Sequence, residues 1–141
     1  MTLVIKQTQD LARCHALRRE VFIEEQGVSE AEELDDKDAS ALHYLAISGD
    51  IAIGTARVLI AGNTAKIGRV CVRASNRGQG VGAQIMQVVL QDMAARGDLT
   101  NARLGAQLTA ITFYERLGFV AQGPVFLDAG IKHRDMVCPL E

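Results

Sequence analysis

Arg77-Gly78-Gln79-Gly80-Val81-Gly82 is the stretch that decides the fold of this chain. The apolar run before it, Ile67-Gly68-Arg69-Val70-Cys71-Val72, is typical of a β-strand, and the segment from Ala83 to Arg96 is typical of a helix. A strand therefore leads through a glycine-rich turn into a helix start, where several backbone N–H groups have no partner inside the helix. Glycines let a ligand approach the backbone closely, and Arg77 adds a positive charge that suits phosphate oxygens. The stretch predicts a phosphate-binding cradle, best suited to a pyrophosphate.

Two other phosphate-binding loops fit the turn less well. A Walker A loop ends in Gly-Lys-Ser/Thr, whereas this turn continues as Val81-Gly82-Ala83. A dinucleotide-binding fold usually begins with its glycine motif and carries an acidic residue about 20 residues later. Here several expected strands come first, and Asp98 follows Gly97, which ends a helix. A helix start with small residues for tight packing, and no ligand, is the remaining alternative.

A longer pattern extends on both sides of the turn. Arg77, Gly80 and Gly82 match Arg/Gln-x-x-Gly-x-Gly/Ala, placed after a strand and before a helix. Together with Ala106-Gln107 and Phe113-Tyr114-Glu115-Arg116-Leu117-Gly118-Phe119 further on, this makes the chain resemble the GCN5-related N-acetyltransferases (GNAT), in their small ElaA-like branch. The resemblance runs from about Arg18 to Met136. It implies an α+β acyl-CoA N-acyltransferase fold, with a mostly antiparallel twisted sheet of about six or seven strands and helices on both faces.

Length and composition predict one domain over residues 1–141. The net charge of −2 argues against a nucleic-acid partner, which would need a basic patch. No apolar run approaches the roughly 18–20 residues that span a bilayer, and the apolar N-terminus is too short for a signal peptide. We therefore expect a cytoplasmic protein with no membrane partner and no metal site, whose thiols are free; these are Cys14, Cys71 and Cys138.

Apolar periodicity and turn residues predict the order of the elements. Thr8 is the expected cap of a first helix that begins at Gln9 and ends at Gly27. Gly49-Asp50 and Ala61-Gly62-Asn63 are the expected turns of an antiparallel meander. Strands are expected at 3–6, 43–48, 51–60, 64–72, 102–105, 119–121 and 131–138, and further helices at 80–96 and 108–117, the last one capped by Gly118.

Arg18 is a charged residue on the apolar face of the expected first helix. It either extends to solvent or needs an acidic partner, because an unpaired buried charge is costly. The acidic segment Glu30–Asp38 supplies candidate partners, and a solvated acidic loop is the alternative.

The same segment carries a second resemblance. The spacing Glu33-x-Asp35-x-x-Asp38, after Arg18-x-x-Val21-Phe22, resembles the acyl-homoserine-lactone synthases, which share the acetyltransferase fold and bind a cationic amine donor. By this resemblance the acids either order the loop against Arg18 or face a cationic acceptor amine. This chain is shorter than those synthases and has the full acetyl-CoA loop, so the resemblance is not used to predict lactone synthesis for it.

The GNAT resemblance implies a binding site for acetyl-CoA. In that family two neighbouring strands, here 64–72 and 102–105, splay apart, and the pantetheine arm lies in the gap like an added strand. An unpaired strand edge suits an amide-rich arm. Gln107 is assigned to the pantetheine or to ordering the site. The backbone partners of the arm would be Val70, Cys71 and Val72, and the pyrophosphate would be held by Arg77, Gly78, Gln79, Gly80, Val81 and Gly82.

Acetyl transfer to an amine needs both a base and an acid. A lysine-like amine has a pKa near 10.4, so freeing it at pH 7 costs roughly 4–5 kcal/mol. Tyr114 matches the family's tyrosine acid, and this residue type stays protonated at pH 7; an aromatic pair with Phe113 is the alternative role. A backbone N–H near Cys71 is expected to hold the oxyanion. The sequence does not single out the base: Glu25 is the preferred candidate, and Glu24, His43 and His133 stay open.

The function predicted is acetyl-CoA-dependent N-acetyl transfer to a primary amine of a small molecule or peptide, by direct attack. Two alternatives stay open: a non-catalytic acyl-CoA-binding regulatory module, and an acyl-homoserine-lactone-synthase-like acyltransferase that would bind S-adenosylmethionine at the acidic segment. The partner expected is the amine acceptor, and a homodimer is left open.

Overall fold

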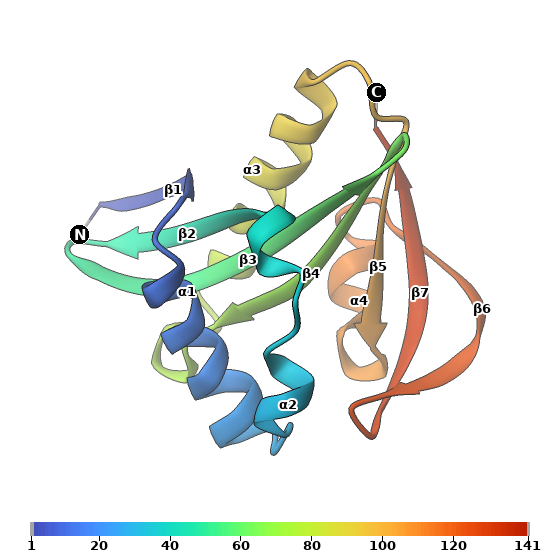
Figure 1. Ribbon diagram of the computed structural model, residues 1–141. Helices are drawn as coiled ribbons and strands as arrows, with labels where there is room; N and C mark the ends of the chain where they lie inside the picture. Colours follow the sequence, from blue (N-terminus) through green and yellow to red (C-terminus); the bar gives the residue numbers. More distant parts are fainter. Residues whose placement is uncertain (1, 141) are drawn as a thin grey trace.

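The computed structural model describes residues 2–140, which form a mixed seven-stranded sheet with helices on both faces (Figure 1). Neighbouring strands follow the order β1-β2-β3-β4-β5-β7-β6, and every pair is antiparallel except β4 with β5. The strands are β1 (Leu3–Thr8), β2 (Leu42–Ser48), β3 (Ile51–Ala61), β4 (Thr64–Val72), β5 (Asn101–Gln107), β6 (Val120–Asp128) and β7 (Ile131–Pro139).

The helical segments vary in type and length. The α-helices are α1 (Leu11–Arg18), α2 (Glu30–Glu33), α3 (Val81–Ala95) and α4 (Ile111–Glu115). A π-helical segment, Arg19–Glu25, continues α1, and 3₁₀ turns occur at Asp38–Ser40, Ala74–Asn76 and Leu108–Ala110.

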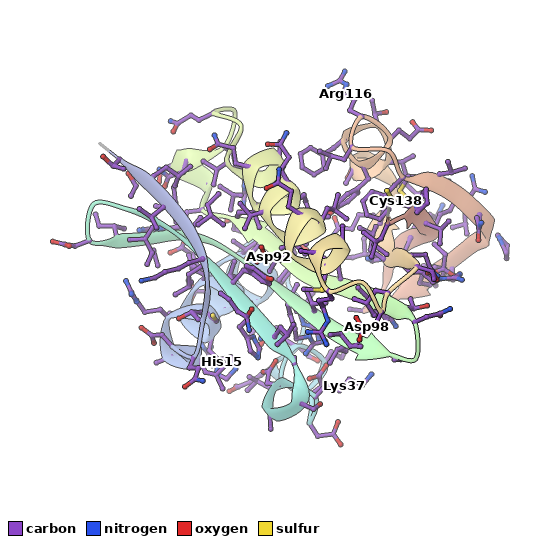
Figure 2. The ribbon with its side chains drawn as sticks, turned by 90° about the horizontal axis from the view of Figure 1, so that it is seen from above. His15, Lys37, Asp92, Asp98, Arg116 and Cys138 are labelled. Atoms are coloured by element: carbon purple, nitrogen blue, oxygen red, sulfur yellow. The ribbon has the colours of Figure 1, made fainter. Side chains whose placement is uncertain are left out.

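Two cores lie on opposite faces of the sheet. The larger core lies under α3, whose apolar residues recur at helical spacing and pack on β2, β3 and β4. The smaller core lies under α1, which packs on the other face, as His15 of α1 and Asp92 of α3 show in Figure 2. The buried residues of α3 are Val81, Ile85, Met86, Val89 and Met93, and the smaller core consists of Cys14, Leu17, Val21, Leu45 and Cys71.

The sheet opens between β4 and β5. These strands pair in parallel only at their first residues, where Thr64–Lys66 lies beside Asn101–Arg103. Beyond Lys66 the two strands diverge, and Figure 1 shows the gap widening from the end near the C-terminus. The later part of β4 therefore has β3 as its only strand neighbour among the described residues. The splay predicted from the family resemblance is present.

A β-bulge lies in β4 at the beginning of this open part. Arg57 of β3 pairs with Gly68 and Thr55 pairs with Cys71, so Arg69 and Val70 together face a single residue of β3. Arg69 has a φ of 52°, in the left-handed region that non-glycine residues rarely adopt. The Arg69 side chain of this bulge lies at the end of α2, where it forms ion pairs with Glu33 and Asp35.

Most predicted elements are confirmed, with four local differences. The first helix begins at Leu11 and is capped by Asp10, because Thr8 is still in β1 and its hydroxyl accepts a hydrogen bond from the Asp10 N–H. That helix changes to π geometry after Arg18. The predicted helix 108–117 is a 3₁₀ turn followed by a short α4. Strand β6 continues to Asp128 instead of ending at Ala121, through an irregularity around Gly123, whose φ is 74°.

Across residues 2–140, none of the helices has the length and apolar character needed to cross a membrane.

Candidate active site

One cavity of about 1040 Å³ runs through the gap between β4 and β5, at the upper end of the size range for small-molecule sites. It connects the glycine-rich turn with the bulge in β4, with α4 and with the turn between β6 and β7. The cofactor residues predicted from sequence are brought together here, with the exception of Gln79. Those that line the cavity are Val70, Cys71, Val72, Arg77, Gly78, Gly80, Val81, Gly82, Gln107 and Tyr114.

The glycine-rich turn forms a cradle at the start of α3. Gly78 and Gly80 both have a φ of 79°, and a Cβ atom added to either would meet no atom within 4 Å. No side chain caps α3, so its first N–H groups are left for another partner. Gly82 has a different role, because an added Cβ would lie 3.4 Å from the Phe113 ring and 3.7 Å from Val72. The turn therefore leaves space for a ligand at Gly80 and provides close packing at Gly82.

Arg77 is held at the edge of the cradle by the chain itself. Its Nη1 and Nη2 donate to the Glu25 carboxylate at 2.8 and 2.9 Å, and its Nε donates to the Val72 carbonyl at 2.9 Å. Both side chains of the ion pair are partly exposed. The ion pair therefore links Arg77, which is predicted to hold the pyrophosphate, to Glu25, which is predicted to be the base. Glu25 itself does not line the cavity.

Tyr114 lies on α4 and lines the cavity from the face of the sheet that α3 covers. Its ring contacts Phe113 and Phe119 edge to face, with centroids 4.9 and 5.9 Å away. Burial raises the pKa of Tyr114 to about 12. The hydroxyl is therefore a neutral proton donor throughout the physiological pH range.

Cys71 lines the cavity from β4 but is not suited to act as a nucleophile. Burial raises the pKa of its thiol to about 12, and the thiolate is the reactive form of cysteine. The thiol therefore stays protonated at neutral pH, which is consistent with a role for the Cys71 backbone only.

The π-helical segment shapes the wall opposite Tyr114. The Gln26 N–H donates to the carbonyl of Val21, five residues earlier, at 3.1 Å. Val21 and Phe22 contribute both to the smaller core and to the wall of the cavity, and Gln26 lines the cavity beside them. Gln26 Oε1 then accepts a hydrogen bond from Gln107 Nε2 at 3.0 Å, which joins the first helix to the end of β5 across the cavity. Gln107 thus has a structural partner that sequence reasoning missed.

The acidic segment is ordered by three arginines, two of which sequence reasoning did not single out. Arg18 is 1% exposed; its Nε donates to Glu33 and its Nη1 donates to Asp38 at 2.9 Å. Arg57 Nη1 donates to Asp35 at 2.8 Å and to Asp38 at 3.2 Å. The available signal was an arginine within each of two largely apolar strands, Arg57 in β3 and Arg69 in β4. We call this group the ion cluster; its members are Arg18, Arg57, Arg69, Glu33, Asp35 and Asp38.

The three carboxylates of the ion cluster are balanced by three arginines. This balance decides whether the acidic segment pairs with Arg18 or is a solvated loop. Each of the three carboxylates contacts at least one arginine of the chain itself. Burial opposes ionisation of Asp38, but hydrogen bonds from Arg18 and His15 bring its pKa well below the usual range. The predicted pairing of the segment with Arg18 is confirmed, and a fully solvated loop is excluded for Glu33, which is 2% exposed.

The four candidate bases lie in different surroundings. Glu24 is exposed, and Glu25 pairs with Arg77. His43 is buried outside the cavity, and its Nε2 lies 2.9 Å from the Asp38 carbonyl oxygen. His133 alone among the four lines the cavity.

Comparisons with known proteins agree with this geometry. Residues 7–140 match the family model described as acetyltransferase (GNAT) domain. An uncharacterized N-acetyltransferase of Bacillus subtilis (strain 168), YjcF, is 35% identical over 136 residues, which are 96% of each chain. Protein ElaA of Escherichia coli (strain K12) is 32% identical over 124 residues, 85% of this chain and 81% of ElaA.

A solved structure extends the comparison to the fold. The acyl-CoA N-acyltransferase from Pseudomonas aeruginosa superposes with a TM-score of 0.84 at 31% identity, covering 97% of this chain and 98% of that one. Acyl-CoA is the donor that the GNAT family uses. This chain belongs to the GNAT acetyltransferase family, with ElaA among its relatives.

Proposed function

We propose that this protein transfers an acetyl group from acetyl-CoA to the primary amine of a small molecule or peptide. The observation that carries the proposal is the continuity of one cavity from the cradle, through the splayed strands, to Tyr114 and the β6–β7 turn. A ligand bound at the cradle can therefore extend to a point where an acid and an incoming acceptor meet. A binding module without catalysis would need the cradle but not this further space.

The residues present fit acetyl-CoA, which would supply an activated acetyl thioester. The uncapped start of α3 and Arg77 would hold the diphosphate, since helix N-termini and guanidinium groups both bind phosphate. The unpaired part of β4, including Val70, Cys71 and Val72, offers backbone groups to an amide-rich arm. Tyr114 Oη holds a proton that it can donate to a departing thiolate.

The direct test is a turnover assay on the full chain. We would incubate the protein with acetyl-CoA and a panel of putrescine, phenethylamine, glycinamide and a lysine-containing tripeptide, and follow the release of free thiol. Amine-dependent thiol release is the expected result. Tight coenzyme A binding by calorimetry, with no transfer to any amine of a broadened panel, would support the binding-module alternative instead.

Gly80→Ala should abolish most coenzyme A binding at a modest cost in stability. The new Cβ would project into the cradle, and alanine at a φ of 79° costs roughly 1–2 kcal/mol. Gly62→Ala is a matched control, because Gly62 also has a positive φ and open space but lies in the β3–β4 turn. Urea unfolding should show similar destabilisation of both variants, and calorimetry should show weakened coenzyme A binding only for Gly80→Ala. Equal affinity of the two variants for coenzyme A would refute the prediction that the glycine-rich turn binds its diphosphate.

Glu25→Gln should strengthen coenzyme A binding about two- to fivefold. The carboxylate occupies two donors of Arg77 and lies near the expected diphosphate, and an exposed pair of this kind is worth up to about 1 kcal/mol. Glu24→Gln, which removes an exposed neighbouring charge, is the control. The same variant tests the base predicted from sequence: if Glu25 takes the amine proton, kcat falls by about 10²-fold or more.

A further inference from the structure

His133 is the histidine that lines the cavity. It lies on β7 between Gln107 of β5 and Phe126 of β6, and it is 8% exposed. Its ring stacks on Phe126, with centroids 5.8 Å apart and planes at 24°. The ring is therefore fixed in orientation by the sheet rather than by a mobile loop.

Hydrogen bonding selects one tautomer of His133. Its Nδ1 lies 2.7 Å from the Ile131 carbonyl oxygen, and a carbonyl oxygen can only accept. Nδ1 therefore carries the hydrogen, which leaves the lone pair of the neutral ring on Nε2. Nε2 makes no hydrogen bond within residues 2–140, so this atom is available to a ligand in the cavity.

The other histidines of the chain are engaged elsewhere. Nε2 of His15 lies 2.8 Å from an Asp38 carboxylate oxygen, and Nε2 of His43 lies 2.9 Å from the Asp38 carbonyl oxygen. Neither residue lines the cavity. The combination of a fixed tautomer, an unoccupied ring nitrogen and access to the cavity is thus specific to His133.

His133 and Tyr114 approach the gap from opposite faces of the sheet. On β5 and β7, Ala106 and Met136 belong to the core under α3. Side chains alternate along a strand, so His133 and its partner Gln107 point to the face that α1 covers. Tyr114 lies on the α3 face, beside the cradle. The space between the diverging strands is the passage that joins these two groups.

Building on the proposed acetyl transfer, we infer that His133 Nε2 accepts the proton of the acceptor amine. The ammonium gives one proton to Nε2, and the nitrogen lone pair then forms the N–C bond while the C–S bond breaks. Tyr114 protonates the departing sulfur and is restored by the second nitrogen proton. His133 returns its proton to solvent, so each amide formed releases one proton overall.

The charges around His133 suit a cationic acceptor. Asp128 and Asp135, both exposed, line the cavity with His133; Asp128 ends the neighbouring strand β6, and Asp135 lies two residues after His133 on β7. Their negative charges attract an ammonium group to this end of the cavity. Apart from the ion cluster, the other charged groups that line the cavity are Glu32, Lys37, Lys66, Arg77 and Arg116.

The variant His133→Asn tests this inference. The asparagine amide can still donate to the Ile131 carbonyl, but no group replaces Nε2. We expect kcat/KM for the panel amine that the wild type acetylates fastest to fall about 10²-fold, with the acid limb of the pH profile lost and coenzyme A affinity unchanged. Added imidazole should restore part of the rate, which it would not do for a purely structural role. His15→Asn removes an imidazole outside the cavity and should keep the acid limb.

Three outcomes would overturn the inference. A His133→Asn enzyme with the wild-type rate and pH profile would show that another group takes the proton, while the proposed function would stand. A loss of rate that imidazole does not rescue, together with a lowered Tm, would show that His133 only supports the fold. Absence of amine-dependent turnover by the wild type would refute the proposed function and this inference together.

Discussion

Tyr114→Phe should lower kcat by about 10²–10⁴-fold, the range typical of a lost general acid. Phenylalanine keeps the edge-to-face contacts with Phe113 and Phe119, so only the hydroxyl proton disappears. Coenzyme A affinity and the free energy of unfolding should therefore change little. Steady-state thiol release, calorimetry and urea unfolding on the same preparations separate these quantities.

The chain contains a matched control for this substitution, because it has only one other tyrosine. Tyr44 is fully buried in the larger core, and its hydroxyl donates to Asp92 at 2.9 Å, away from the cavity. Tyr44→Phe should cost about 0.5–1.5 kcal/mol of stability and leave kcat unchanged. Equal kcat values for the wild type and Tyr114→Phe would show that Tyr114 is not the general acid.

The raised pKa of Tyr114 leads to a prediction for the alkaline side of the pH–rate profile. Burial raises its pKa to about 12, so the donor stays protonated as the pH rises through 8, 9 and 10. The rate should therefore show no decline from tyrosine ionisation in that range. A fall in kcat near pH 10 that Tyr114→Phe eliminates would show that the hydroxyl titrates like an exposed phenol.

Arg18→Ala should destabilise the fold by about 3–5 kcal/mol, the usual cost of removing one partner from a buried ion pair. Glu33 would remain 2% exposed without its main counter-charge, and Asp38 would lose one of its arginines. Urea unfolding measures the change. Arg13→Ala removes the exposed Arg13–Asp10 pair of the same helix and should have a small effect. A loss below about 1 kcal/mol for Arg18→Ala would mean that the cluster does not anchor the acidic segment.

The ion cluster also makes stability depend on pH, with a defined sign. The folded protein holds the pKa of Asp38 below its ordinary value of 3.8, so folding favours the charged carboxylate. This contribution is complete above about pH 5 and is lost as the pH falls below the ordinary value. Unfolding free energies measured between pH 7 and pH 2 should therefore decline less steeply for Arg18→Ala than for the wild type.

The parts of the fold that the sequence predicts best are those where local signals agree. The apolar run 64–72, the glycine-rich turn and the apolar helix after it each point to one structure, and the structure contains β4, the cradle and α3. The later part of β6 escaped prediction because Gly123 and Pro124 are turn residues, and only the neighbouring β7 holds this segment extended. The π-helical segment had no local signature, because it depends on packing against the sheet.

The cavity lining was predictable where its residues belong to the glycine turn, to the end of β4 or β5, or to α4. The ion cluster was half predicted: Arg18 was identified because a charge among apolar residues needs a partner. Arg57 and Arg69 were not identified from the sequence, because their role depends on the register of β3 and β4 and on the bulge at Arg69. The pairing of Glu25 with Arg77 and that of Gln26 with Gln107 join residues more than 50 positions apart, and spacing within a sequence cannot reveal such contacts.

The short parallel pairing of β4 with β5 divides the sheet into two ladders of hydrogen-bonded strands. Strands β1 to β4 carry α1 and α3, whereas β5, β6 and β7 carry α4, and three residues on each side join the two ladders. A small rotation about this junction would change the width of the gap without breaking a backbone hydrogen bond along either diverging arm. Backbone hydrogen bonds therefore do not set the width of the gap. Side-chain contacts across it do, through the Gln107–Gln26 hydrogen bond and the packing of Phe113 beside Gly82, so a bulkier acyl chain would have to displace these contacts.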